Sequence, residues 1–236
     1  MAVEILRGVV GSQAYGLATP GSDVDVMAVH VASTRDILGL SASKVTSATT
    51  HTTSPDFTSH ELGKYCELAL KANPTLLELL WLSSYDVATD AGLLLVDSRE
   101  AFLSTRTVKA AYGGFALSEA QKIDRVAGRN GILATENAGR VEKRGRHAYR
   151  MLIQAQQLLA SGELPVDVSS HRDEILAMGR MAVNTPREFS ARVAGAVQRL
   201  DGAASILPDE PDRERVDELV RAIRTEQVRA DLAAGI

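Results

Sequence analysis

The chain has 236 residues, 45% of them hydrophobic, 24% charged and 4% aromatic, and its formal net charge is −4. The negative charge excludes a globally basic nucleic-acid binder, and so few aromatic side chains exclude a platform that stacks several bases. The single cysteine, Cys66, excludes an intrachain disulfide and a multi-cysteine metal site. Because the sequence shows no secretory signal and no apolar stretch of about 20 residues, we expect a cytoplasmic globular protein with no membrane partner.

Strand patterns concentrate in residues 1–87. An apolar run ends at Val10 and stops at Gly11-Ser12, and a second run alternates valines with aspartates before it becomes apolar throughout. A loop dense in turn residues separates the two runs, and a stretch of small hydroxylic residues follows them as a flexible or strand-edge connection. We predict strands over residues 4–10, 23–31 and 55–59, a loop over 16–22 and the hydroxylic connection over 41–54.

From Glu61 onward, the apolar residues recur with a helical period. Asn73-Pro74 and Thr185-Pro186 each place proline at the first position of a predicted helix, and Thr185 with Glu188 matches a capping box. Two helices are predicted between Glu61 and residue 87. Further helices are predicted over residues 89–103, 107–126, 140–161, 170–181, 186–200 and 211–233.

The order of these elements predicts the fold class and the domains. A small mixed α/β unit over residues 1–87 is followed by an all-helical unit over 88–236, which is an α+β organisation. The candidate linkers are the Gly- and Asn-rich segment 124–139 and the segment 201–211.

The pattern that points to chemistry is Gly11-Ser12 followed, after ten residues, by Asp23-Val24-Asp25. Aspartates at i and i+2 of a strand share one face, and their mutual repulsion favours a cation between them. Mg²⁺ takes oxygen ligands and is often completed by substrate phosphates, while a Gly-Ser turn offers N–H groups and a hydroxyl to a phosphate. The combination is typical of phosphoryl or nucleotidyl transfer.

The string Val10-Gly11-Ser12…Asp23-Val24-Asp25 resembles the signature of the polymerase-β-like nucleotidyltransferase superfamily. The fuller string, Gly11-Ser-Gln-Ala-Tyr-Gly-Leu-Ala-Thr-Pro-Gly-Ser-Asp-Val-Asp25, is similar to a bacterial and phage branch that includes a group associated with RNA repair. The segment from Asp56 through Lys64 to Leu80 and the stretch Lys143-xxx-His147-xx-Arg150 resemble later parts of the same branch, so the resemblance covers about residues 8–165.

This resemblance implies roles for individual residues. Asp23 and Asp25 would be metal ligands for Mg²⁺ or Mn²⁺, and Asp56 would be the third carboxylate, sharing the metal and helping to deprotonate the attacking hydroxyl. Gly11 and Ser12 would hold the β- and γ-phosphates. We expect Lys64 to be a phosphate contact or a surface lysine, and Glu78 to have a structural role or to pair with a buried cation. Glu61 is expected to cap a helix and Cys66 to be a buried small hydrophobe.

The stretch 140–150 gathers six basic groups, which by default form a solvated helix face. Three of them share one side of the predicted helix because they are spaced i, i+4 and i+7: Lys143, His147 and Arg150. This side would bind a nucleoside triphosphate or an RNA backbone. The other members are Arg140, Arg144 and Arg146, of which Arg144 and Arg146 point elsewhere, toward a polyanionic acceptor if one binds.

We therefore expect a metal-dependent nucleotidyltransferase that transfers a nucleoside monophosphate from an NTP, such as ATP, to an acceptor hydroxyl with release of pyrophosphate. A tRNA-like RNA is the expected acceptor, and a protein or a small molecule is an alternative. A second alternative is a catalytically silent nucleotide-binding or antitoxin-like module. The sequence does not fix the oligomeric state.

Overall fold

The computed structural model describes residues 2–40, 42–53, 56–128 and 135–235, and the chain divides into two compact units. Unit 1 comprises Met1–Leu103 and Pro211–Ile236, and unit 2 comprises Ser104–Glu210. The boundary expected after residue 87 therefore falls inside unit 1. The last helix also belongs to unit 1, because local periodicity predicts a helix but not the unit against which it packs.

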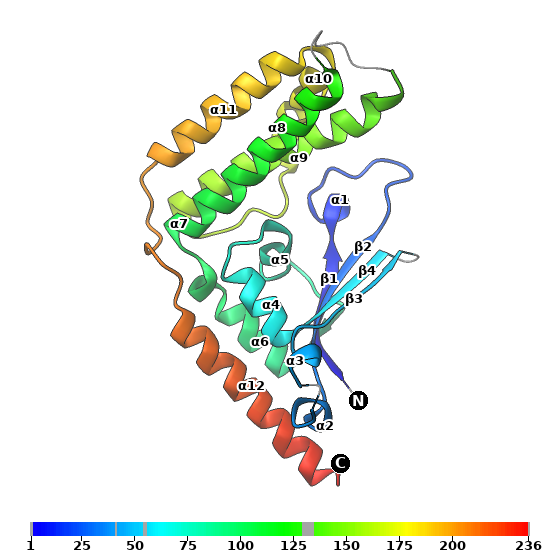
Figure 1. Cartoon of the computed structure of the whole chain (residues 1–236), viewed down its shortest axis with the longest axis vertical. Coiled ribbons are helices and arrows are strands. Elements are labelled where there is room, and N and C mark those ends of the chain that lie inside the picture. Colours follow the sequence, from blue (N-terminus) through cyan, green and yellow to red (C-terminus); the bar gives the residue numbers. More distant parts are fainter. Residues whose placement is uncertain (1, 41, 54–55, 129–134, 236) are drawn as a thin grey trace. The chain divides into compact units, whose positions relative to one another are not determined.

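Within the described residues, five strands of unit 1 form one mixed sheet in the order β3-β4-β2-β1-β5 (Figure 1). Strands β2 and β4 run parallel, whereas β1 pairs antiparallel with β2 and β5, and β3 pairs antiparallel with β4. The strands are β1 (Val3–Val10), β2 (Asp25–Val31), β3 (Thr49–Thr53), β4 (Asp56–Glu61) and β5 (Val87–Ala88).

The predicted strands are confirmed as β1, β2 and β4, with three differences. Strand β1 begins at Val3, one residue before the predicted start. Strand β2 begins at Asp25 rather than at Asp23, and β4 extends to Glu61; Pro55, the first residue of the third predicted strand, lies outside the described residues. The hydroxylic connection contains the exposed edge strand β3, and β5 was not predicted.

Helices pack on the sheet of unit 1 through small and apolar contacts. An added Cβ at Gly92 would lie 2.1 Å from the Ile5 carbonyl oxygen, so the close approach of α6 to β1 requires glycine there. Leu62, Tyr65 and Leu77 are fully buried in the core. The helical elements are α1 (Gly11–Ala14), α2 (Thr34–Ile37), α3 (Ala42–Val45), α4 (Leu62–Ala69), α5 (Pro74–Leu79), α6 (Asp90–Asp97), the 3₁₀ helix η1 (Arg99–Phe102) and α12 (Arg213–Ala233).

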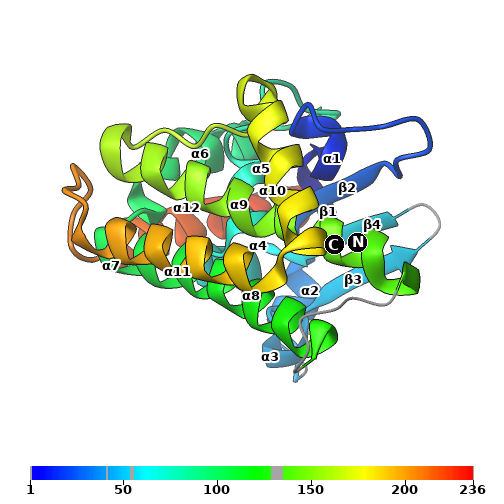
Figure 2. The ribbon, with the colours of Figure 1, turned by 90° about the horizontal axis from the view of Figure 1, so that it is seen from above.

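The described residues of unit 2 form helices joined by loops, and α8, α9 and α11 run side by side while α10 crosses α9 (Figure 2). Helices α9 and α10 cross closely, since an added Cβ at Gly145 would lie 2.6 Å from the Ala182 Cβ and one at Gly179 2.6 Å from the Arg146 Cγ. The elements are α7 (Thr105–Val108), the π-helical turn η2 (Lys109–Gly113), α8 (Gly114–Ala127), the 3₁₀ helix η3 (Thr135–Asn137), α9 (Ala138–Ser161), the 3₁₀ helix η4 (Ser169–His171), α10 (Arg172–Asn184) and α11 (Pro186–Gly202).

The sheet followed by helices confirms the α+β class, and the helix signals had different outcomes. Asn73 caps α5 by accepting from the Leu76 N–H, with Pro74 at the first helical position. The capping box at Thr185 is wrong: the Thr185 hydroxyl turns back and donates to the Met181 carbonyl, 3.4 Å away, at the end of α10. Residues 129–134 of the linker expected over 124–139 lie outside the described residues. None of the described helices is both long and apolar enough to cross a membrane.

Candidate active site

The turn that leaves β1 is built on Gly11. Its φ is +71°, a left-handed conformation that favours glycine, and α1 begins at the same residue. An added Cβ at Gly11 would lie only 2.0 Å from Asp25 Oδ2. The Asp25 carboxylate therefore rests directly against the Gly11 backbone, in a space that any side chain would fill.

Asp25 and Asp56 lie side by side on neighbouring strands. Asp25 is the first residue of β2 and pairs in register with Val10 of β1 on one side and with Asp56, the first residue of β4, on the other. Paired residues on adjacent strands are about 5 Å apart at their Cα atoms and carry side chains on the same face. Two carboxylates so placed repel each other, which favours a bound cation.

Asp23 occupies a different setting from the one expected. It lies in the loop before β2 and is exposed. The expectation that Asp23 and Asp25 share a strand face is therefore wrong, because β2 begins only at Asp25. The carboxylate that the sheet pairs with Asp25 is that of Asp56, 31 residues further along the chain.

The donor set fits a metal ion completed by substrate. Within the part of the chain that the structure describes, no three His, Cys, Asp or Glu side chains are grouped closely enough to hold a metal by themselves. Mg²⁺ is commonly bound by one or two carboxylates, while phosphates and waters supply the other ligands. Asp25 over the Gly11 cradle, with Asp56 beside it, provides such a pair.

Tyr15 connects the turn after β1 to α5. It follows α1 directly, and its hydroxyl donates a 2.6 Å hydrogen bond to Glu78 Oε2 on α5. Glu78 is fully buried, which confirms its structural role. Pairing with a buried cation was the alternative to this structural role, and nothing in the residue pattern identified Tyr15 as a partner of Glu78.

His51 is the second residue near the site that sequence analysis missed. It lies on β3, with its Nδ1 3.8 Å from Asp56 Oδ1 and 3.0 Å from the Thr58 hydroxyl. The signal that could have found it is the run of β-branched threonines on both sides of His51 over 49–53, a composition typical of strands, within the predicted connection.

The structure does not bring Lys64 to this pair of carboxylates. Lys64 lies on α4, beyond the end of β4 opposite to Asp56, and lines a separate pocket. A strand rises about 3.3 Å per residue, so Asp56 and Glu61 are about 16 Å apart along β4, and Lys64 is further along the chain. Glu61 caps α4 as expected, accepting from the Gly63 N–H.

The three basic residues predicted to bind nucleotide lie on α9 of unit 2, in three different environments. Lys143 is exposed, whereas Arg150 is 2% exposed and donates to Gln154 Oε1. The His147 ring packs against Phe115, with centroids 4.7 Å apart, and burial lowers its pKa to about 3. His147 is therefore neutral at neutral pH, and its binding role stays a prediction together with those of Lys143 and Arg150.

Two further arginines of the basic stretch take part in contacts within unit 2. Arg144 pairs with the buried Glu119 on α8 at 2.7 Å, and Lys122 pairs with the same carboxylate at 2.6 Å. Arg140 donates to Asn137 at the start of α9. These contacts give Arg140 and Arg144 structural roles, since each supports the packing or the end of a helix.

Comparison with known proteins places these features in a family. No curated protein matches the sequence at a significant level. The model of the RNA repair pathway DNA polymerase beta family matches residues 3–222, which extends past the resemblance seen in the motifs and includes both units. The chain belongs to the RNA repair pathway DNA polymerase beta family, a group of polymerase-β-like nucleotidyltransferases.

Proposed function

We propose that this protein is a metal-dependent nucleotidyltransferase that transfers a nucleoside monophosphate from an NTP to a hydroxyl group of RNA. The observation that carries the proposal is the in-register pair of Asp25 and Asp56, with the Asp25 carboxylate against Gly11 at the start of the turn after β1. Family membership supports the reaction class, and the RNA repair description of the family supports RNA as acceptor.

The division of labour follows from the positions of these residues. Asp25 and Asp56, together with Asp23 from the preceding loop, would hold Mg²⁺ or Mn²⁺. When bound, the ion neutralises phosphate charge and orients the reacting groups. The backbone N–H groups and the Ser12 hydroxyl at the turn bind the leaving phosphates.

The reaction is an in-line displacement. The acceptor hydroxyl oxygen forms a bond to the α-phosphorus, the bond from that phosphorus to the bridging oxygen breaks, and pyrophosphate leaves with the electron pair. Asp56 accepts the proton of the attacking hydroxyl on a carboxylate oxygen. Its side chain is 46% exposed, which leaves it accessible to an incoming acceptor.

The test measures transfer of label from α-phosphate-labelled NTPs to RNA, to a protein lysate and to aminoglycosides. We expect Mg²⁺-dependent labelling of RNA, and a loss of at least about 100-fold for Asp25→Asn and Asp56→Asn, because each removes a carboxylate that acts on the reacting phosphates. Asp97→Asn is the matched control, since Asp97 is exposed at the end of α6. Full activity of both site variants would falsify the assignment, and labelling of protein or aminoglycoside alone would overturn the RNA acceptor.

A further inference from the structure

A pocket lies in unit 1, away from the paired carboxylates. It has a volume of about 480 Å³, within the range of small-molecule sites, and its walls come from the residues after α3, from α4 and the turn after it, and from α12. Cys66, Leu70, Val216 and Val220 give it an apolar part. The pocket therefore combines an apolar wall with the charged side chains of two helices.

The charged lining is basic on balance, in a protein whose net charge is −4. Four basic side chains face two acidic ones, Glu67 and Asp217. Glu67 is neutralised by Arg213, with hydrogen bonds of 2.7 and 3.0 Å. The remaining basic residues are Lys64, Lys71 and Arg224.

Lys64 and Lys71 are available to a ligand. They lie seven residues apart, two turns along one side of α4 and its C-terminal extension. Neither ammonium group forms an ion pair with any residue in the described ranges. A lysine ammonium group is a compact point charge that binds phosphate well.

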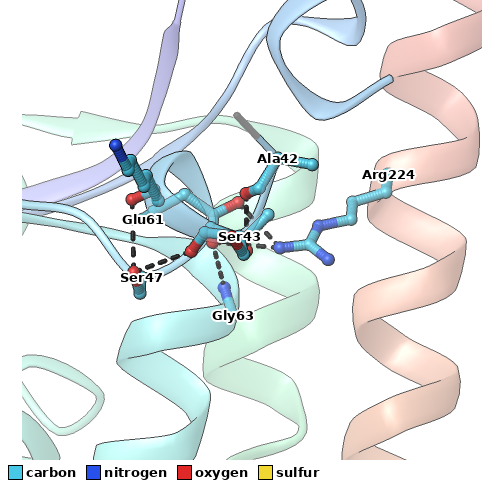
Figure 3. Close-up of polar contacts among 8 residues, drawn as sticks. Ala42, Ser43, Ser47, Glu61, Gly63 and Arg224 are labelled. Atoms are coloured by element: carbon cyan, nitrogen blue, oxygen red, sulfur yellow. Dashed lines mark hydrogen bonds and ion pairs between the residues drawn. The ribbon is translucent and has the colours of Figure 1, made fainter. Parts of the chain in front are cut away.

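Arg224 is fixed at the pocket by a buried carboxylate (Figure 3). Glu61, fully buried, accepts from Arg224 Nη2 at 2.9 and 3.0 Å and from the Gly63 N–H at 2.7 Å. An added Cβ at Gly63 would lie 2.8 Å from Arg224 Nη2, so glycine leaves room for the guanidinium group. Arg224 Nε is buried, and among the described residues it has no hydrogen-bond partner.

We propose that this pocket binds a phosphorylated small molecule of nucleotide size, as a second site distinct from the Asp25–Asp56 pair. Lys64 and Lys71 neutralise the phosphates, the guanidinium group of Arg224, held in place by Glu61, lines the site, and the apolar wall accommodates the remainder of the ligand. A multiply charged anion fits better than a single carboxylate, because two cations, Lys64 and Lys71, remain after the Arg213–Glu67 and Arg224–Glu61 pairs, and Asp217 is paired with Arg221. The proposal does not rest on the transferase activity.

Cys66 allows ligand binding in the pocket to be measured. It is the only cysteine in the chain, it lines the pocket, and it is 3% exposed. Burial raises the pKa of its thiol to about 12, so it reacts slowly, over a time that can be followed. Alkylation of the full chain with a neutral maleimide, read by mass spectrometry, therefore reports on this site alone.

The experiment measures the alkylation rate in EDTA, which withholds metal from the paired carboxylates. The additions are pyrophosphate, ATP, adenosine and a short oligoribonucleotide. We expect ATP and pyrophosphate to slow the reaction with saturation, and adenosine to have no effect. Protection by adenosine alone, by the oligoribonucleotide alone, or by none of the four would each overturn the proposal.

Variants separate this site from the candidate active site and from a general gain in stability. Lys64→Ala with Lys71→Ala should weaken protection by ATP at least about tenfold, as expected for the loss of charge-assisted contacts. Lys44→Ala, at an exposed lysine of α3 outside the pocket, and Asp25→Asn should both retain protection. If the double lysine variant keeps full protection by ATP, or if Asp25→Asn loses it, ATP binds at another site and the proposal is overturned. Asp25→Asn is also tested for nucleotidyl transfer, which is a separate measurement, so each proposal can fail without the other.

Discussion

The hydroxyl of Tyr15 donates a 2.6 Å hydrogen bond to Glu78 Oε2, joining the residue that follows α1 to a fully buried carboxylate on α5. The bond ties the turn that carries Gly11 and Ser12 to the core of unit 1. The position of this turn therefore depends on a contact between residues 63 positions apart in the chain.

Tyr15→Phe tests this contact. Removing one donor from a buried carboxylate should lower the free energy of unfolding by about 1–3 kcal/mol, measured by urea denaturation. Tyr149→Phe is the matched control, since Tyr149 donates to Glu174 at an exposed position and its loss should cost less than about 1 kcal/mol. Equal stability of the two variants would contradict the anchoring role of Tyr15.

Gly11→Ala should displace the Asp25 carboxylate. The new Cβ would lie 2.0 Å from Asp25 Oδ2, and a φ of +71° strains any other residue. Because displacement of a reactive group by about 1 Å can cost 10²-fold in rate, we expect at least that loss in nucleotidyl transfer. Gly21→Ala is the control: its φ is +89° and nothing lies within 4 Å, so it carries the strain without the collision. Similar activity of the two variants would show that the contact between Gly11 and the Asp25 carboxylate does not matter for transfer.

Arg224→Met should be strongly destabilising. It leaves the Glu61 carboxylate buried without its cation, and breaking such a pair costs on the order of 3 kcal/mol. Arg229→Met removes an exposed pair with Glu226 on the same helix and should cost less than about 1 kcal/mol. Urea denaturation compares the two, and an unchanged midpoint for Arg224→Met would show that Glu61 finds another partner.

His147 should make stability fall with acid. Burial and the nearby Arg150 lower its folded-state pKa to about 3, below the ordinary 6.5. Above pH 6.5 both states are neutral at this ring, whereas between pH 6.5 and 3 only the unfolded state binds the proton. The free energy of unfolding should then fall by about 1.4 kcal/mol per pH unit as the pH is lowered.

His147→Gln isolates this contribution. In this variant the free energy of unfolding should fall less steeply as the pH is lowered below 6.5, measured by denaturation across that range. His171→Gln, which removes a half-exposed histidine elsewhere in unit 2, is the control. If the free energy of unfolding varies with pH in the same way for the wild type and His147→Gln, the ring binds its proton as readily in the folded state as in the unfolded state, and the prediction is wrong.

Local patterns predicted the strands that form the site, while contacts distant in sequence fixed the rest. Strands β1, β2 and β4 follow from apolar alternation, and the Gly-Ser…Asp-x-Asp spacing identified Gly11 and Asp25. Strand β5 is only two residues long and exists by pairing with Leu6 and Arg7, so no period can reveal it. The same holds for the Glu61–Arg224 pair, which is separated by 163 positions.

The basic stretch on α9 shows why a shared helix face does not establish a binding face. Lys143, His147 and Arg150 have the expected spacing, yet exposure falls from Lys143 to Arg150 along the helix as it enters the core of unit 2. Spacing fixes direction around a helix, whereas burial depends on the neighbours that tertiary packing supplies.

Because the chain returns to unit 1 at Pro211, unit 2 is a single continuous segment inserted into unit 1. The Asp212 N–H donates to the Ala101 carbonyl at 2.9 Å, and the Thr105 N–H donates to the Pro208 carbonyl at 2.7 Å. Each unit therefore has its two connecting ends side by side. A short peptide bridging Leu103 to Pro211 would turn unit 1 into one continuous polypeptide, and unit 2 could be excised as a single segment with neighbouring termini.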